Sequence, residues 1–174
     1  MTLTDQVAVV TGGARGLGKR IAIRLSQEGA AVVLAAPEEN ELEQTAREIR
    51  GDGGRAFPVQ TDITQEDQVS QMVARTKDEF GRIDILVNNA GIAGPTAPVH
   101  EVDRAEWEET LAVNLTGAYL CSKAVLPEMI ARRSGKIVNI SSIAGKIGHK
   151  FRSPYAVSKW GVIGLTLTVA SEVG

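Results

Sequence analysis

A tyrosine and a lysine stand four residues apart in the segment SPYAVSKWG, residues 153–161. Ser153 followed by Pro154 predicts a helix start, with the serine as N-cap and the proline at the first helical position. At helical spacing Tyr155 and Lys159 share a face with apolar residues, so this face should be buried. A phenol and an ammonium group on such a face are either a coincidence of packing or an acid/base pair. The predicted stripe consists of Tyr155, Lys159, Val162, Thr166, Val169 and Val173.

A second feature is TGGARGLGKR, residues 11–20, a glycine-rich turn that opens a predicted helix. Glycines let a backbone approach a phosphate, and a helix N-terminus adds N–H groups and a positive dipole end. The turn is not a P-loop because Arg20 stands where a hydroxyl would hold magnesium, and it is not GxGxxG because Ile21 is too bulky for the sixth position. A plain strand-to-helix turn is the alternative. The pattern that fits is TGxxxGxG, with Thr11, Gly12, Gly16 and Gly18.

Short β-rich runs alternate with longer amphipathic segments along the chain. This alternation predicts a parallel sheet with helices on both faces, in which ligands bind beyond the carboxyl ends of the strands. The longer loops at 91–98 and 145–152 follow strand ends, so they should border a site. The expected strands are 7–11, 30–35, 55–60, 83–88 and 136–141, and the expected helices end near 28, span 38–50 and 65–80, lie within 103–131 and begin at 154.

The composition is that of one globular domain over residues 1–174, with 43% hydrophobic and 23% charged residues and a net charge of -2. The longest apolar run, 30–36, is too short to cross a bilayer, and the first residues do not form a signal peptide. We therefore expect a cytoplasmic protein with no nucleic-acid or membrane partner. The single cysteine, Cys121, excludes an internal disulfide, and the residue spacings predict no metal site.

Taken together, these motifs resemble the short-chain dehydrogenases/reductases of the ordinary, non-extended type, over essentially the whole chain. The resemblance implies a Rossmann-type doubly wound parallel α/β sheet, with five strands here in the order 3-2-1-4-5. It also implies an oxidoreductase that transfers a hydride between NAD(P)(H) and a small alcohol or carbonyl substrate. The motifs are TGGARGLG at 11–18, DIT at 62–64, NNAG at 88–91, Asn114, SSIAG at 141–145 and YAVSK at 155–159.

The resemblance implies a catalytic tetrad of Asn114, Ser142, Tyr155 and Lys159. Ser142 fits better than Ser141 because it stands 13 residues before Tyr155, the usual spacing in the family. Carbonyl reduction develops negative charge on oxygen, which requires a hydrogen-bond donor and an acid. Ser142 would be the donor and Tyr155 the acid, while Lys159 would favour the phenolate and hold the nicotinamide ribose. For the pair alone, the alternative is a core tyrosine beside a snorkelling lysine.

Asn114 stands out without the resemblance, because it is the one carboxamide on a predicted buried stripe, and a buried amide needs partners. It would either form a structural hydrogen bond that distorts the helix or, by the resemblance, hold a water that relays protons to Lys159; the two are compatible. We expect Cys121 to be a packing residue and His149 to be a solvated loop residue. The stripe consists of Trp107, Leu111, Asn114, Ala118, Cys121 and Val125.

By the resemblance, the cofactor lies along the carboxyl ends of the strands. Asp62 would bind the adenine edge; it could instead cap a helix, but Thr64 with Asp67 already resembles a capping box. Gly91 would let the backbone pass close to the cofactor, whereas Asn88 and Asn89 could simply tie neighbouring strands together. The expected cofactor contacts are Thr11, Gly12, Arg15, Gly16, Leu17, Gly18, Asp62, Ile63, Asn89, Ala90, Gly91, Tyr155 and Lys159.

The choice between NAD and NADP depends on the end of the second strand, where an acid would hold the ribose 2′-hydroxyl and an arginine would accommodate a 2′-phosphate. Ala36 and Pro37 occupy these positions, so both patterns are missing. The absent acid removes a clash with phosphate and Arg15 could supply positive charge, whereas Glu38 and Glu39 oppose it. The sequence leans to NADP.

The family continues beyond the point where Gly174 caps the last predicted helix, with two more strands and further helices. We therefore expect a C-terminally incomplete domain whose fifth strand, 136–141, is an exposed edge and whose last helix stays partly wet. Such a fragment should be marginally stable and nearly inactive alone. The full-length form should pair the helices that carry Asn114 and Tyr155 into a homodimer or homotetramer. The alternative functions are a non-catalytic NAD(P)-binding sensor and, opposed by Arg20, a P-loop NTPase.

Overall fold

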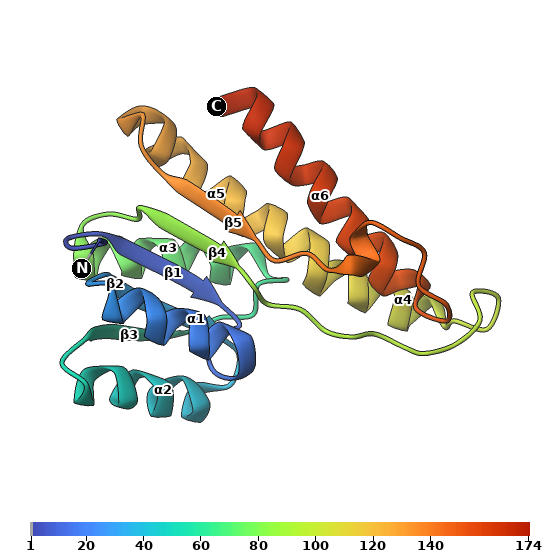
Figure 1. The fold of residues 1–174 in the computed structure, drawn as a ribbon, viewed down its shortest axis with the longest axis horizontal. Coiled ribbons are helices and arrows are strands. Elements are labelled where there is room, and N and C mark those ends of the chain that lie inside the picture. Colours follow the sequence, from blue (N-terminus) through green and yellow to red (C-terminus); the bar gives the residue numbers. More distant parts are fainter. Residues whose placement is uncertain (1) are drawn as a thin grey trace.

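The computed structural model describes residues 2–174. Five parallel strands form one sheet in the order β3-β2-β1-β4-β5, with helices on both faces (Figure 1). This confirms the predicted doubly wound, Rossmann-type α/β fold and its strand order. The strands are β1 (Val7–Thr11), β2 (Ala31–Ala36), β3 (Arg55–Gln60), β4 (Ile85–Asn88) and β5 (Lys136–Asn139).

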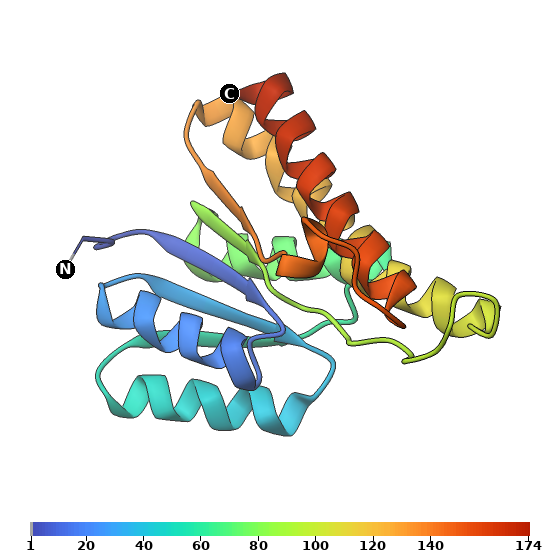
Figure 2. The same ribbon diagram turned by 45° about the vertical axis from the view of Figure 1, so that its right-hand side comes forward.

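The helices follow the strands in sequence, and the predicted helix within 103–131 is divided by a π-helical turn. Helices α1 and α2 cover one face of the sheet, and α3 and α5 cover the other (Figure 2). The helices are α1 (Gly16–Gln27), α2 (Glu39–Gly51), α3 (Glu66–Phe80), α4 (Arg104–Leu111), α5 (Gly117–Arg132) and α6 (Ser153–Val173), with a π-helical turn η1 (Ala112–Thr116) and a 3-10 turn η2 (Ile143–Gly145).

The central strands are buried on both faces, as parallel strands between two helix layers must be. Successive residues of β1 point to opposite faces: Val7 and Val9 pack with α3 and α5, while Ala8 and Val10 pack with α1 and α2. Cys121 of α5 is fully buried in the first of these cores, which raises its pKa to about 12 by desolvation. It is a packing residue, as predicted.

The outer strand β5 and the second half of α6 are the exposed parts of this architecture. Strand β5 pairs only with β4 and alternates exposed with half-buried residues. The predicted stripe of α6 is buried at Lys159 and Val162, but Val173 is 44% exposed. A cleft of about 730 Å³ separates the last turns of α6 from α5 and β5. The stripe is therefore buried at Lys159 and Val162 and exposed at Val173, in agreement with the expectation that the last helix stays partly wet.

Two predicted helix starts are wrong by one or two residues. The backbone N–H of Ala156 donates to the carbonyl of Arg152, so Arg152 is the N-cap of α6 and Ser153 already lies in the helix. The Oγ of Ser153 is buried without a partner. Helix α3 begins after Gln65, because the Thr64 hydroxyl donates to Asp62 and caps nothing. The predicted Thr64 capping box is therefore absent.

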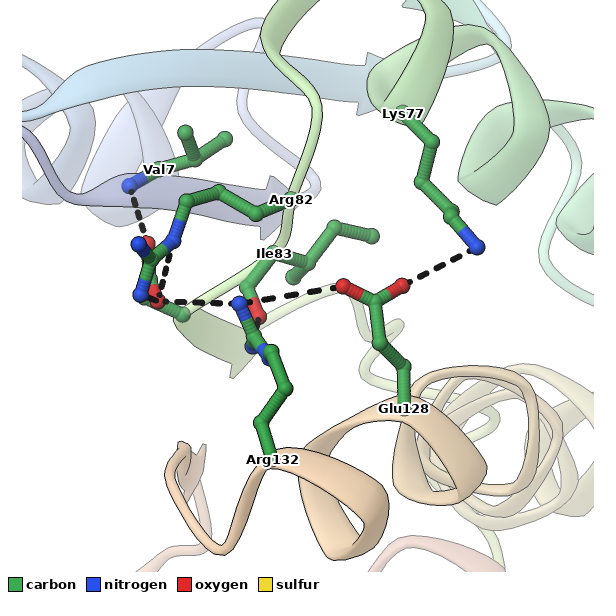
Figure 3. Close-up of polar contacts among 7 residues, drawn as sticks. Val7, Lys77, Arg82, Ile83, Glu128 and Arg132 are labelled. Carbon is green, nitrogen blue, oxygen red and sulfur yellow. Dashed lines mark hydrogen bonds and ion pairs between the residues drawn. The ribbon is translucent and has the colours of Figure 1, made fainter.

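A buried carboxylate, Asp84, ties β1 to β4 at the amino end of the sheet. Figure 3 labels its partners Val7, Arg82 and Arg132. The Asp84 side chain is 8% exposed. Its Oδ2 accepts a hydrogen bond from the backbone N–H of Val7 at 3.0 Å, and its Oδ1 accepts from Arg82 Nε at 2.9 Å and Nη2 at 2.6 Å. Arg132 Nη1 lies 3.5 Å from the same oxygen. The carboxylate is thus paired with two guanidinium groups and a backbone donor.

The second of these guanidinium groups extends the cluster to two helices. Arg132 of α5 donates from Nη2 to the carbonyl of Ile83 at 2.5 Å and lies 3.7 Å from Glu128. Glu128 in turn pairs with Lys77 of α3 at 3.1 Å. The cluster therefore joins β1, β4, α3 and α5 at the end of the sheet opposite to the predicted site. In the described part of the chain, no helix is long and apolar enough to cross a membrane.

Candidate active site

A cavity of about 420 Å³ lies beyond the carboxyl ends of β1 to β4, where the fold predicts a ligand. Nine of the residues that line it were predicted cofactor contacts: Gly12, Arg15, Leu17, Gly18, Asp62, Ile63, Asn89, Ala90 and Gly91. Four other predicted contacts, Thr11, Gly16, Tyr155 and Lys159, lie outside its lining.

The glycine turn forms one wall of the cavity, and its shape depends on missing side chains. Gly12 and Gly16 have positive φ angles of 64° and 57°, which glycine adopts without strain. A Cβ on Gly18 would collide with the carbonyl oxygen of Gly12, so the first turn of α1 can pack directly on the end of β1. No side chain caps α1 at Arg15, which leaves its first N–H groups without a side-chain acceptor. These features fit a phosphate group.

Thr11 and Asn89 hold the ends of β1 and β4 together beneath this wall. The Thr11 hydroxyl accepts hydrogen bonds from the backbone N–H groups of Asn89 and Ala90, both at 3.1 Å. The Asn89 amide donates to the carbonyls of Thr11 at 3.0 Å and Gly12 at 3.4 Å. Asn89 therefore acts as the strand tie that the sequence left as an alternative, although it also lines the cavity.

Asn88 links the end of β4 to β5 and α5 on the other side of the strand. Its Nδ2 donates to Asn139 Oδ1 at 2.8 Å and to Ser122 Oγ at 3.1 Å. Asn139 in turn donates from Nδ2 to the hydroxyl of Thr166 on α6 at 2.9 Å. This run of amides and hydroxyls fixes α6 against the two outer strands.

Asp62 lines the cavity after β3 and is held by a neighbouring turn. Its Oδ1 accepts from the backbone N–H of Thr64 at 2.9 Å and from the Thr64 hydroxyl at 2.8 Å. Its own backbone N–H donates to Gln68 at 2.8 Å. Asp62 caps no helix, because the N-cap of α3 is Gln65.

The end of β2 carries the residues that bear on the choice of cofactor. Ala36, Pro37 and Glu38 line the cavity beside Arg15. The Arg15 guanidinium lies 3.5 Å from Glu38 and 3.6 Å from Glu41, and its side chain is 72% exposed. The positive charge of Arg15 is thus partly balanced by two acids, but the long distances and the exposure make these weak pairs.

Asn114 is buried in the π-helical turn between α4 and α5. Its Oδ1 accepts from the backbone N–H of Ile92 at 2.7 Å, and its Nδ2 donates to the Ile92 carbonyl at 3.0 Å and to the Ser158 hydroxyl at 3.0 Å. The helix distortion that the sequence offered as one role for this amide is therefore present. Both amide hydrogens are engaged in fixing the chain after Gly91 and the middle of α6.

Lys159 is 5% exposed, and burial lowers the pKa of its ammonium group. Its Nζ donates to the carbonyl of Ile140 at 2.9 Å and lies 5.7 Å from the centre of the Tyr155 ring. A Cβ on Gly91 would lie 3.1 Å from Asn114 Oδ1 and 3.5 Å from Lys159 Nζ. Because Gly91 also lines the cavity, the lysine and the asparagine lie at the edge of the cavity, with the Tyr155 ring beside the lysine.

The two serines after β5 have different partners. Ser141 donates from Oγ to the carbonyl of Lys159 at 2.9 Å, so its proton is engaged in holding α6. Ser142 instead accepts from the backbone N–H of Ala144 at 3.2 Å and begins η2. A hydroxyl that accepts in this way can still donate its own proton. The structure therefore leaves Ser142, and not Ser141, free to act as a donor.

Several cavity residues were not predicted as contacts. Ala35 and Thr61 stand at strand ends and follow from the rule that ligands bind there. No sequence pattern near Ile92 or Val113 predicts a place in the cavity. They reach it because the hydrogen bonds of Asn114 bring the chain after β4 and the π-helical turn together. His149, predicted to be solvated, is exposed. Across residues 2–174, no three His, Cys, Asp or Glu side chains lie close enough to hold a metal ion.

The chain belongs to the short-chain dehydrogenase/reductase family, because residues 6–174 match the family model described as short chain dehydrogenase. It is 46% identical over 166 residues to cis-4-hydroxycyclohexanecarboxylate dehydrogenase of Sinomonas cyclohexanicum, covering 95% of this chain and 66% of that protein. It is 42% identical to 3-oxoacyl-(acyl-carrier-protein) reductase of Synechocystis sp., covering 98% and 69%. The chain thus spans about two thirds of the length of these curated relatives.

Solved structures of the family superpose closely on this fold. A metagenomic short-chain oxidoreductase in complex with NADP gives a TM-score of 0.95 at 42% identity, covering 99% of this chain and 78% of that chain. An NAD+-bound xylitol dehydrogenase gives a TM-score of 0.97 at 35% identity, covering 99% and 66%. These two neighbours bind different forms of the nicotinamide cofactor, so the likeness supports a nicotinamide cofactor without choosing between the forms.

Proposed function

We propose that the chain carries the catalytic centre of an NAD(P)-dependent oxidoreductase that interconverts an alcohol and a ketone or aldehyde, with Tyr155 as the acid/base. The observation that carries this proposal is the position of Gly91. It lines the cavity on one side and packs against Asn114 and Lys159 on the other, so the ligand and the tetrad meet there. Full-length activity would belong to the longer form that the relatives represent.

The cavity residues fit a dinucleotide. Gly12 and Gly18, with the open first turn of α1, would hold the pyrophosphate, and Asp62 with Ile63 would meet the adenine. The backbone from Asn89 to Gly91 would follow the nicotinamide half, with Tyr155 and Lys159 at its ribose. When bound, the nicotinamide supplies the hydride in the reducing direction and accepts it in the oxidising direction.

The proton chemistry falls to the chain itself. The free O–H of Ser142 would donate to the carbonyl oxygen as negative charge develops there. Tyr155 would give its proton to that oxygen, and the nearby Lys159 would stabilise the resulting phenolate. Because both amide hydrogens of Asn114 are engaged, a relay water would bind to the remaining lone pair of its Oδ1 or to a carbonyl freed by the π-helical turn.

We favour NADP over NAD. No acid stands at the end of β2, where Ala36 lines the cavity, and Arg15 lies close enough to turn from Glu38 and Glu41 toward a 2′-phosphate. The two glutamates weaken this preference.

The proposed setting is the cytoplasm, with a small-molecule substrate and no nucleic-acid or membrane partner. The full-length form would be a homodimer or homotetramer built on α4, α5 and α6. Large apolar side chains exposed on α5 and α6 support such an interface. Sedimentation that shows a monomer at micromolar concentration would count against it. The exposed side chains are Tyr119, Ile130, Val157, Trp160 and Leu167.

A Tyr155→Phe substitution tests the acid/base role. It removes the phenolic proton while keeping the ring, so kcat for carbonyl reduction should fall by about 100-fold or more, and cofactor binding should persist. The control is Tyr119→Phe on α5, an exposed tyrosine, which should leave kcat unchanged. The assay follows NAD(P)H absorbance with a panel of diketones and quinones. Cofactor binding by the full-length form without turnover of any carbonyl would favour the alternative, a nucleotide-binding sensor.

A further inference from the structure

Two loops outside the cavity are joined beside the tetrad. The loop from β4 to α4 meets the segment that precedes α6, and the two lie side by side in Figures 1 and 2. The backbone N–H of Ala97 donates to the carbonyl of Phe151 at 3.0 Å. Arg152 donates from Nη1 to the Thr96 hydroxyl at 2.7 Å. The guanidinium of Arg152 is therefore fixed by a loop more than fifty residues away in sequence.

Arg152 also lies against the ring of Tyr155. Its Cζ is 5.5 Å from the ring centre, within the range of a cation–π contact. A guanidinium carries five N–H donors, and the only side-chain hydrogen bond of Arg152 in the described chain uses one of them. The remaining donors are thus held close to the proposed acid/base and can bind a planar acceptor.

Within residues 2–174, no carboxylate forms an ion pair or hydrogen bond with the Arg152 guanidinium. The sequence from Met129 to Ser171 contains no Asp or Glu, although the whole chain has a net charge of -2. The two acids at the end of the facing loop have other partners: Glu101 lies 3.4 Å from His100, and Asp103 caps α4 by accepting from Ala105 at 2.8 Å.

The loop after Ser142 adds further positive charge around the same place. Lys146 and Lys150 are exposed there, and Lys150 Nζ lies 4.7 Å from the centre of the Phe151 ring. The segment between Ser142 and Tyr155 is therefore positively charged, although the whole chain is not. Exposed cations of this kind attract anions to a site and raise the rate of association.

We propose that Arg152 binds the carboxylate of the substrate, and that the substrate is a short hydroxy acid or keto acid. The inference rests on the proposed oxidoreductase function and specifies its substrate class. A carboxylate matches the planar fork of a guanidinium and accepts two parallel hydrogen bonds from it. Bound in this way, it would orient the reacting carbonyl toward Tyr155 and Ser142, while Lys146 and Lys150 steer the anion to the site.

The first test compares short keto acids with their methyl esters as substrates, using the ratio of kcat/KM for acid over ester. Arg152→Gln should lower this ratio about tenfold, the effect of losing a hydrogen bond between charged groups. Arg152→Lys keeps the charge without the fork and should retain part of the ratio. The control is Lys136→Gln on β5, which removes an exposed cation away from the site and should leave the ratio unchanged. An unchanged ratio in Arg152→Gln overturns the inference.

The second test measures binding without turnover. At constant ionic strength, levulinate should raise the Tm of the wild type and of Lys136→Gln more than its methyl ester does, and Arg152→Gln should lose this difference. If levulinate binds through Arg152 but the full-length form consumes no ketone, the anion site stands and the proposed reaction is wrong. If ketones are consumed but neither the ratio nor the Tm difference depends on Arg152, the reaction stands and the anion site is wrong.

Discussion

At the amino end of the sheet Asp84 is surrounded by Arg82, Arg132 and the N–H of Val7, whereas at the carboxyl end Arg152 has a hydroxyl and an aromatic ring as its partners. Both ends hold charged groups that are at least partly buried. At the amino end the charged groups form ion pairs with one another (Figure 3). The carboxyl end keeps N–H groups and cations available, which is the arrangement that a ligand with negative charge requires.

The two ends also differ in how the backbone contributes. At the amino end, side chains match most of the buried donors and carbonyls, as between Arg132 Nη2 and the carbonyl of Ile83, although Arg132 Nε is buried without a partner. At the carboxyl end, the first turn of α1 has no side-chain cap, and Gly12 and Gly16 adopt positive φ angles. Unmatched groups reduce stability unless a ligand binds them. We therefore expect substitutions at the amino end to change stability, and substitutions at the carboxyl end to change binding and catalysis.

The largest effect should follow Asp84→Ala. The substitution leaves the buried N–H of Val7 without an acceptor and removes the carboxylate that pairs with Arg82 and Arg132. Because both guanidinium side chains are partly exposed, the expected cost is that of one unsatisfied buried donor, about 1–3 kcal/mol. Urea unfolding should show this loss in the free energy of unfolding. The control is Asp78→Ala on α3, which removes an exposed carboxylate and should change stability by less than about 0.5 kcal/mol. Similar results for the two variants would mean that the Asp84 cluster contributes no more than a surface pair.

A smaller effect, on binding alone, is expected for Ala36→Asp at the carboxyl end. A carboxylate at the end of β2 would face the 2′-phosphate of NADP and could accept from the 2′-hydroxyl of NAD. The ratio of kcat/KM for NADPH over NADH should fall about tenfold or more. The control, Ala131→Asp, places the same charge on the exposed surface of α5 and should leave the ratio unchanged. If Ala36→Asp also leaves it unchanged, the end of β2 does not face the ribose.

Much of the carboxyl end could be predicted from the sequence, because its residues follow strand ends and carry recognisable types. The glycine turn, Asp62 and the chain from Asn89 to Gly91 are examples. The strand order is likewise predictable, because the resemblance covers the whole chain. The contacts of Arg152 with Thr96 and Tyr155 could not be predicted, since they depend on how two distant loops pack.

The amino end carries a sequence signal for its buried ion-pair cluster. Asp84 lies inside the apolar run IDILVN, and an acid in such a run is rarely buried unless it is paired. Its partners, Arg82 two residues earlier and Arg132 on α5, could not be chosen without the fold. The exact start of α6 also escaped prediction, because the backbone of Arg152 replaces the expected Ser153 cap.

The smallest effect concerns Lys159, the buried cation of the proposed tetrad, and appears as a dependence of stability on pH. Burial lowers the pKa of Lys159 in the folded chain below its ordinary value of 10.5. Between the folded pKa and 10.5 the unfolded chain therefore binds more protons than the folded chain, so the stability contributed by this group increases as pH rises through that range. It is fully present above 10.5 and is lost as pH falls through the folded pKa.

Lys159→Met removes this titration while keeping an unbranched side chain. We therefore subtract the free energy of unfolding of Lys159→Met from that of the wild type, and this difference should increase from neutral pH toward pH 10.5. The lost hydrogen bond to Ile140 adds only an offset that does not change with pH. Urea unfolding of both proteins across this pH range measures the difference, and titrating groups that do not interact with Lys159 cancel in it. Repeating the pair of measurements in a Tyr155→Phe background removes the neighbouring phenol that does interact with it. The control, Lys136→Met, removes an exposed lysine of β5 and should give a difference that does not change with pH. If the difference for Lys159→Met stays constant or decreases with pH, burial of the protonated Lys159 does not destabilise the folded chain.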